Sequence, residues 1–222
     1  VGAALLVAHV VEADGRDLVH AEGLGGHDAA VVYESSQLIN EYGFELGIQL
    51  MIGLPGDTLE KCIYSAQETV RIGPAIARLY PTIVINDTEL YNQYKRGEYE
   101  PLTQEEAIRR TKEMYKILDD AGINIIRVGL KASEIMENEI GFHPAFRQLV
   151  ESEIAKDRIE AQLTGLPGGS YSVLANLHSF GNIYGHKGQN REYFAKKYPR
   201  LILKGAADES LSDNQYKVIP AV

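Results

Sequence analysis

Apolar residues recur at near-helical spacing between residues 28 and 42. The apolar positions are Val31, Val32, Leu38 and Ile39. Asp28 precedes them as a candidate cap, and Gly43 stands where a helix closes with a left-handed residue, so the pattern predicts a helix over 28–42. The mostly apolar run 44–52 that follows is too short for an ordinary helix. It predicts a buried parallel strand.

The same strand and helix pattern repeats along the chain. Thr58 opens a helix that Gly73-Pro74 ends, and the Ile- and Val-rich run 75–85 predicts a strand that bends or lies near an edge at Pro81. Thr103 and Glu106 form a capping box at the start of a long helix, and the last strand of the series covers 124–130. The alternation predicts a parallel sheet or barrel, with its functional loops at the carboxyl ends of the strands, at 53–57, 86–89 and 128–133.

The final third of the chain has a different composition. A helix is expected from Pro144 to about Leu163, and Gly165 to Gly169 is the best linker candidate, which divides the chain into domains 1–163 and 164–222. After the linker, lysine and arginine outnumber the acids locally. Strands at 171–177 and 201–203 are expected to flank a basic amphipathic helix.

Composition narrows the functional classes. The chain has 222 residues, of which 45% are apolar, and a formal net charge of -9, which argues against a protein that wraps nucleic acid over its whole surface but leaves room for a local basic patch. The apolar run at 1–11 has no preceding basic segment and does not read as a secretory signal, and no apolar stretch approaches the roughly 20 residues of a bilayer span. We expect a cytoplasmic protein with no membrane partner. Cys62 is the only cysteine, so this chain alone builds neither a disulfide nor a cysteine-rich metal site.

A glycine-rich turn is the first motif that carries chemistry. In GIQLMIGLPGDT, residues 47–58, the turn lies between a strand and a helix start, where free backbone amides would let the polar groups of a ligand approach. The alternative is a tight structural turn in which Pro55 fixes one dihedral angle. No Gly-Lys-Ser/Thr follows, so the turn is not a Walker loop.

Four segments in this order resemble a known family. They are GLPGDT at 53–58, RLYPTIVINDTELYNQYKRGEYEPLTQEEA at 78–107, AGINIIRVGL at 121–130 and FHPAFRQLVESEI at 142–154. Together they are similar to the second half of radical S-adenosylmethionine (radical SAM) proteins of the Elongator catalytic-subunit and oxygen-independent coproporphyrinogen-oxidase type. GHD at 26–28 resembles the R-G-H sequence of that family, whereas residues 1–25 do not match its preceding strand.

The resemblance implies an α/β fold, the second half of a partial (β/α)6 barrel. In the family, a C-x-x-x-C-x-x-C loop holds a 4Fe-4S cluster that binds S-adenosylmethionine and cleaves it to a 5'-deoxyadenosyl radical. This chain lacks that loop. The implied partner is therefore a cluster-binding amino-terminal half, and neither the cluster nor S-adenosylmethionine is expected to stay bound to this chain alone.

The resemblance also implies a cofactor surface. Gln49, Met51, Gly53 and Gly56 come from the strand and turn at 44–57, and Arg78 and Tyr80 come from the next strand. Alternate strand residues share a face, so Gln49 and Met51 would face the lumen together, as would Arg78 and Tyr80. The alternatives are that Met51 fills the core and that Arg78 is ion-paired or lies at an exposed strand start; Arg127 allows the same two interpretations.

The basic tail resembles a K-homology (KH) pattern, an α+β module in which a GxxG loop joins two helices and clamps a nucleic-acid backbone. The candidate nucleic-acid-binding residues are Gly185, His186, Lys187, Gly188 and Arg191. The alternative is a loop that only turns the chain, with its lysines on a solvated face. His143 before Pro144 has no second ligand at useful spacing, so we expect it to begin a helix and expect no metal site.

Two functions follow from these patterns. The first is a radical SAM enzyme whose substrate or scaffold is tRNA or another RNA. The second is an RNA-binding module whose barrel remnant is structural and has no catalytic role.

Overall fold

The computed structural model describes residues 3–8, 29–130, 140–141 and 143–221. The chain divides into two compact units, Val1–Phe146 and Arg147–Val222. GHD at 26–28 and the Asp28 cap lie outside the described residues.

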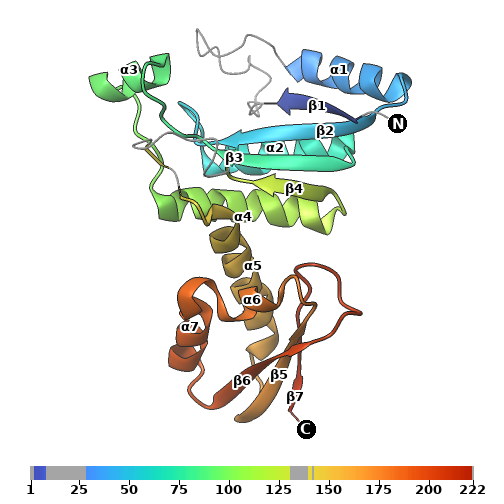
Figure 1. The fold of residues 1–222 in the computed structure, drawn as a ribbon, viewed down its shortest axis with the longest axis vertical. Helices are drawn as coiled ribbons and strands as arrows, with labels where there is room; N and C mark the ends of the chain where they lie inside the picture. The colour runs from blue at the N-terminus through green and yellow to red at the C-terminus, as the bar shows by residue number, and fades with distance from the viewer. Residues whose placement is uncertain (1–2, 9–28, 131–139, 142, 222) are drawn as a thin grey trace. The chain divides into compact units, whose positions relative to one another are not determined.

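A four-stranded parallel sheet forms the centre of the first unit (Figure 1). Its strands are β1 (Ala3–Ala8), β2 (Glu45–Ile52), β3 (Ile76–Pro81) and β4 (Asn124–Val128), in the order β1-β2-β3-β4. Each neighbouring pair is parallel. The prediction of successive parallel strands with helical connections is confirmed, while closure into a radical SAM barrel stays a prediction.

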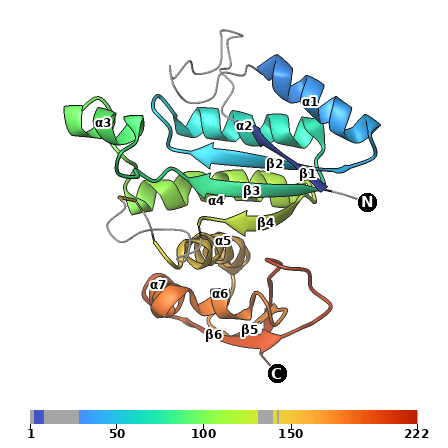
Figure 2. The same cartoon turned by 45° about the horizontal axis from the view of Figure 1, so that its top comes forward.

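Helices α1 (Ala29–Glu41), α2 (Leu59–Ile72), α3 (Glu89–Arg96) and α4 (Gln104–Asp120) connect these strands. Thr58 caps α2 by accepting from the Lys61 amide, and Gly73 closes that helix in the left-handed conformation. Thr103 accepts from the Glu106 amide at the start of α4. α2 and α4 cover one face of the sheet (Figures 1 and 2), and the β2 residues that face them are fully buried: Leu46, Ile48, Leu50 and Ile52.

Pro81 ends β3 rather than bending it. The strand was expected to run to residue 85 on or near an edge, but it lies between β2 and β4 and stops at Pro81. Proline lacks a backbone donor, so it is tolerated where ladder bonding ends. The next amide, that of Thr82, donates to the Ile52 carbonyl over 2.8 Å.

The second unit has its own three-stranded sheet. The elements are α5 (Phe146–Leu163), β5 (Gly169–Ala175), α6 (Phe180–Tyr184), the short 3-10 helix η2 (His186–Gly188), α7 (Gln189–Lys197), β6 (Leu201–Ala207) and β7 (Lys217–Pro220). The strand order is β6-β5-β7, with β5 parallel to β6 and antiparallel to β7. The order strand, helix, Gly185–Gly188, helix, strand agrees with the predicted arrangement, although β7 was not predicted. A relationship to KH domains stays a prediction.

The boundary between the units differs from the expected one at 163/164. α5 contributes Ala155, Ile159 and Leu163 to the same apolar cluster as Val173 and Phe194 of the second unit. The expected linker at 165–169 is therefore a turn inside that unit. α5 also begins at Phe146, two residues after Pro144. Within the described residues, no helix combines the length and apolar character that crossing a bilayer requires.

Candidate functional site

One face of the first sheet gathers the predicted cofactor residues. Gln49 and Met51 on β2 and Arg78 and Tyr80 on β3 are half-buried, and they alternate with fully buried residues of the same strands. We call this surface, with Arg127 of β4, the polar face. Met51 does not fill the core under α2 and α4, because Leu50 and Ile52 occupy that side.

Strand register places these side chains in two rows across the polar face. Gln49, Arg78 and Arg127 occupy paired positions, and Met51 is paired with Tyr80. A register shift between Ala77 and Arg78 leaves Ile126 as an extra residue in β4. Without this shift Ile126 would stand opposite Arg78, so the irregularity brings Arg127 to the row.

Arg78 is not ion-paired within the part of the chain that the structure describes. Its Nε atom is buried and has no hydrogen-bond partner there. Arg78 is also the third residue of β3, so it does not lie at the start of the strand. A buried guanidinium nitrogen without a hydrogen-bond partner costs free energy. Arg78 is therefore a stronger ligand-binding candidate than the sequence alone indicated.

The turn after β2 is closed by contacts within the protein. The Gly53 amide donates to Asp57 Oδ2 over 2.7 Å, and the Gly53 carbonyl accepts from the Tyr99 hydroxyl over 2.6 Å. A Cβ atom on Gly53 would lie 2.7 Å from Leu102. The expectation of a free amide is therefore wrong at Gly53. Gly56 has open space where a Cβ would stand, and its carbonyl accepts from Lys61.

Asp57 is the centre of this turn. Arg110 donates to the Asp57 carbonyl over 3.0 Å and lies 3.8 Å from its carboxylate. The Cys62 thiol is 3.1 Å from Asp57 Oδ2, and burial, with the neighbouring carboxylate, raises the pKa of Cys62. Cys62 is therefore a neutral structural thiol. Burial likewise raises the pKa of Tyr99 to about 12. Sequence reasoning missed the roles of Tyr99 and Arg110, since only the fold brings them to the turn.

The loop Gly185–Gly188 has an unusual backbone. Gly185, Lys187 and Gly188 all have positive φ angles, of 73°, 52° and 84°. A Cβ on Gly185 would lie 2.9 Å from the Asn190 amide nitrogen. Asn190 is itself buried and donates to the Ser152 and Asn182 carbonyls, which joins α5, α6 and α7. Glycine is thus required at 185 for close packing.

His186 and Lys187 differ in their surroundings. The His186 amide donates to Ser152 Oγ over 3.2 Å, and its Nδ1 lies 3.1 Å from Gln148 Oε1. His186 is therefore held against α5, which carries both Ser152 and Gln148. Lys187 is exposed and, like Arg191, makes no ion pair within the described chain.

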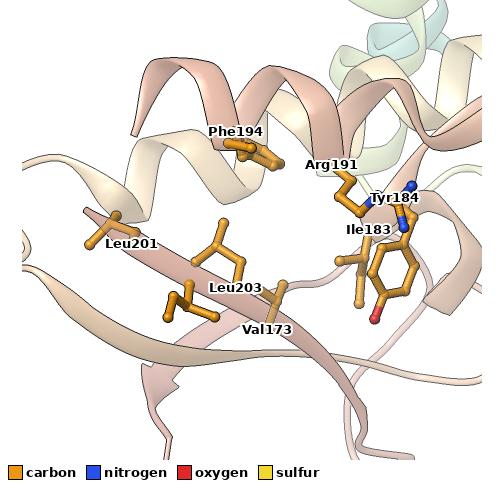
Figure 3. A pocket seen from close by; sticks show the side chains of 9 residues that line it. Val173, Ile183, Tyr184, Arg191, Phe194, Leu201 and Leu203 are labelled. Atoms are coloured by element: carbon orange, nitrogen blue, oxygen red, sulfur yellow. The ribbon is translucent and has the colours of Figure 1, made fainter. Parts of the chain in front are cut away.

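An apolar groove of about 230 Å³ lies between α7 and β6, next to this loop (Figure 3). Phe194 of α7 and Leu201 and Leu203 of β6 line it, and Arg191 lies beside Tyr184 at one end. The surrounding segment is basic: residues 164–207 contain six Lys and Arg but one acid, Glu192. Phe194 of this lining also belongs to the buried apolar cluster of the unit, and Arg191 is the charged residue of the lining.

His143 is a helix-start residue, as expected. Its Nδ1 accepts from the Ala145 amide over 3.1 Å, just before α5. Over the described ranges, no cluster of three His, Cys, Asp or Glu side chains is arranged to hold a metal ion.

Comparison with known proteins finds a family match in the central part of the chain. Residues 74–156 match the radical SAM C-terminal domain. The chain is 37% identical over 86 residues to a tRNA uridine(34) acetyltransferase of Methanocaldococcus jannaschii, which covers 37% of this chain and 16% of the relative. It is 31% identical over 146 residues to the protein of that name from Dehalococcoides mccartyi, which covers 60% of this chain and 30% of the relative.

Elongator proteins are matched in the same way. Elongator complex protein 3 of Dictyostelium discoideum is 37% identical over 78 residues, covering 33% of this chain and 14% of the relative. A solved Methanocaldococcus infernus Elp3 structure with a deleted amino terminus aligns with a TM-score of 0.47 at 24% identity, over 60% of this chain and 32% of that one. The chain thus spans less than a third of the length of these relatives. The predicted resemblance to radical SAM proteins of the Elongator type is confirmed.

Proposed function

We propose that this chain is part of a radical SAM enzyme that modifies RNA, and that the polar face binds part of S-adenosylmethionine. The observation that carries the proposal is the common face of Gln49, Met51, Arg78 and Tyr80 on a parallel sheet. Residues 74–156, which include β3 and β4, match the radical SAM C-terminal domain. A cytoplasmic location forms part of the same proposal.

The side chains of the polar face fit S-adenosylmethionine in chemical type. Met51 and Tyr80 offer apolar and aromatic surface to an adenine ring, Gln49 offers an amide, and Arg78 offers a guanidinium to a carboxylate. Bound S-adenosylmethionine supplies the 5'-deoxyadenosyl group in radical SAM chemistry. The residues of this chain orient the cofactor and shield it from water, and the bonds of Tyr99 and Asp57 to Gly53 fix the adjoining turn.

The residues of this chain do not fit the 4Fe-4S cluster. Such a cluster needs several thiolate ligands, whereas the single cysteine is the fully buried Cys62. Burial raises the pKa of that thiol and keeps it protonated. The cluster ligands therefore belong to the proposed amino-terminal half, which would meet this chain as its partner.

RNA is the proposed substrate. Two relatives are named as tRNA uridine(34) acetyltransferases, which supports tRNA as the substrate class here. The basic segment around Gly185–Gly188 offers a phosphate-binding surface in a chain that is acidic overall.

The cofactor role is tested in the complete parent protein, with its cluster reconstituted, by measuring S-adenosylmethionine affinity and 5'-deoxyadenosine release. Tyr80→Ala removes aromatic surface from the polar face and is expected to weaken the cofactor affinity about tenfold. Lys187→Ala, in the other unit, is the control and should leave affinity unchanged. Equal affinity in the parent and the Tyr80→Ala protein would refute the proposal.

The second candidate function is RNA binding without catalysis. The observation that favours it is the groove between α7 and β6, with Lys187 and Arg191 free of acid partners beside it. A parent gene with a C-x-x-x-C-x-x-C sequence supports the enzyme, and its absence supports the binding module.

The RNA-binding role is tested with the chain itself by fluorescence anisotropy of labelled tRNA at several salt concentrations. Replacing Lys187 and Arg191 together by alanine should weaken binding about tenfold and lower the slope of log K against log salt by about 2. Replacing Lys204 of β6 and Lys217 of β7 together by alanine is the charge-matched control, because both side chains are exposed. An unchanged slope in the double variant would show that the loop does not contact phosphate.

A further inference from the structure

Two buried polar atoms on β3 and its continuation lack partners. They are Arg78 Nε and Thr82 Oγ1, and they are two of five such side-chain atoms in the described part of the chain. The other three belong to Ser65 in α2, Thr111 in α4 and Tyr216 in the second unit. Buried polar groups in proteins are nearly always hydrogen-bonded, so two unpaired atoms on one segment point to a missing ligand.

Arg78 and Thr82 belong to the same face. Thr82 follows the end of β3, yet its amide donates to the Ile52 carbonyl, which continues the ladder between β3 and β2. Residues 78, 80 and 82 therefore keep strand alternation, with Tyr80 between the two unpaired groups. Thr82 thus extends the polar face towards the carboxyl end of the sheet, where parallel folds bind their ligands.

The charge of this surface favours an anion. Arg127 occupies the position opposite Arg78 in the strand register, and both side chains are basic. Glu45 shares the alternation of Gln49, but it lies four residues away, or about 13 Å along the strand. Arg127 has contacts of its own, so the unpaired polar groups of this face are those of Arg78 and Thr82.

We propose that the polar face binds an anionic ligand whose carboxylate or phosphate pairs with Arg78 and which hydrogen-bonds Thr82. The inference deepens the proposed function, because it assigns the charged end of the ligand to a specific side chain and adds Thr82 to the site. A carboxylate would come from the amino-acid part of S-adenosylmethionine. A phosphate would come from an RNA nucleotide.

The test is a site-resolved titration of the ¹⁵N-labelled chain followed by amide chemical shifts. Inorganic phosphate should shift the amides of residues 78–80 and 82 in a saturable way. Arg78→Gln should weaken that affinity about tenfold, since it removes a charge-assisted hydrogen bond. Thr82→Val keeps the side-chain shape and should weaken it about threefold. The amides of 185–188 serve as an internal control, because these substitutions should not change their response.

Paired probes distinguish the two ligand sources. S-adenosylmethionine is compared with its decarboxylated analogue, and uridine monophosphate with uridine. A carboxylate-dependent shift at 78–82 supports the cofactor source, and a phosphate-dependent shift supports the RNA source. A response to uridine monophosphate but not to S-adenosylmethionine would assign the anion site to an RNA phosphate, and the cofactor role is decided separately by the affinity measurement in the cluster-loaded parent protein.

The proposal is overturned if no probe shifts 78–82, or if the shifts persist unchanged in Arg78→Gln and Thr82→Val. Should Arg78→Gln fail to fold, the near-isosteric Thr82→Val decides the result alone.

Discussion

Single residues fix the turn between β2 and α2. The Gly53 amide and carbonyl are bound by Asp57 and Tyr99, and Leu102 fills the space above its Cα atom. Glycine is therefore favoured at position 53 for two reasons. The turn requires a positive φ, here 88°, and Leu102 leaves no space for a side chain. The turn is held in place because the amide and the carbonyl of Gly53 both have hydrogen-bond partners.

Tyr99→Phe tests this anchor. The substitution leaves the Gly53 carbonyl without its donor, in a place where Tyr99 is 7% exposed. We expect the first unit to lose about 1–2 kcal/mol of unfolding free energy, measured by urea denaturation. Tyr94→Phe, at a tyrosine that is 37% exposed, is the matched control and should cost almost nothing. Equal losses in both variants would argue against the anchor.

Gly185→Ala tests the packing of the basic loop. Gly185 and Gly165 both have positive φ angles, of 73° and 81°, so alanine is strained at either position. Only at Gly185 would the new methyl group meet a neighbour, Asn190, whereas nothing lies within 4 Å at Gly165. We expect Gly165→Ala to cost about 1 kcal/mol and Gly185→Ala at least about 2 kcal/mol more. Thermal unfolding of the two variants would show whether the order holds.

At the scale of elements, α4 links its own cap to the turn after β2. Its first-turn Glu106 bonds both Arg109 and Arg110, and Arg110 continues to Asp57. Hydrogen bonds from Arg109 and Arg110 lower the pKa of Glu106 to about 2. The carboxylate thus stabilises the helix start and holds the arginine that braces the turn.

This lowered pKa predicts how stability depends on pH. The Glu106 carboxylate contributes stability above its unfolded pKa of 4.5, and the contribution is lost as the pH falls towards 2. The difference in unfolding free energy between the natural chain and Glu106→Gln should therefore shrink steadily between pH 4.5 and pH 2. Glu105→Gln, one residue earlier on the same helix, removes an exposed carboxylate and is the control. Denaturant melts across this range provide the measurement, and a constant difference would refute the assignment.

At the scale of the whole molecule, the two units differ in charge. Residues 1–146 contain twelve Lys and Arg against 23 Asp and Glu, while residues 147–222 contain ten against eight. Within the second unit several α5 acids are neutralised: Glu151 by Arg147, Glu153 by Lys156 and Glu160 by Lys197. The free positive charge lies after α5, near the groove, so any nucleic-acid contact should be local and sensitive to salt.

The division into units predicts which fragments fold. A fragment covering 143–222 retains α5 and should unfold cooperatively, because Ala155, Ile159 and Leu163 complete its apolar cluster. A fragment covering 164–222 follows the boundary that the sequence indicated, but it lacks this helix. We expect circular dichroism to show a thermal transition for the first fragment and none for the second. A folded 164–222 fragment would show that the domain boundary lies at 163/164, as the sequence indicated.

Local signals in the sequence predicted much of the fold and part of the site. Side-chain periodicity located β2, β3 and β4, and the caps at Thr58, Gly73 and Thr103 fixed helix ends, because these features depend on residues a few positions apart. Strand alternation also placed Gln49 with Met51, and Arg78 with Tyr80. Parallel pairing then joined both sets on one face.

Contacts between residues distant in sequence required the tertiary structure. Tyr99 reaches Gly53 across 46 residues, and the extra residue Ile126 decides that Arg127 stands opposite Arg78. α5 joins the second unit because its apolar face packs there, although the glycine-rich segment after it resembles a linker. Thr82 lies within the strand that the sequence predicted over 75–85, and only the structure shows that its hydroxyl is buried and lacks a partner. The sequence alone determined the local elements and the alternation of faces, whereas packing decided which faces meet and which polar groups stay unpaired, because those depend on the free energy of contacts that only the folded chain makes.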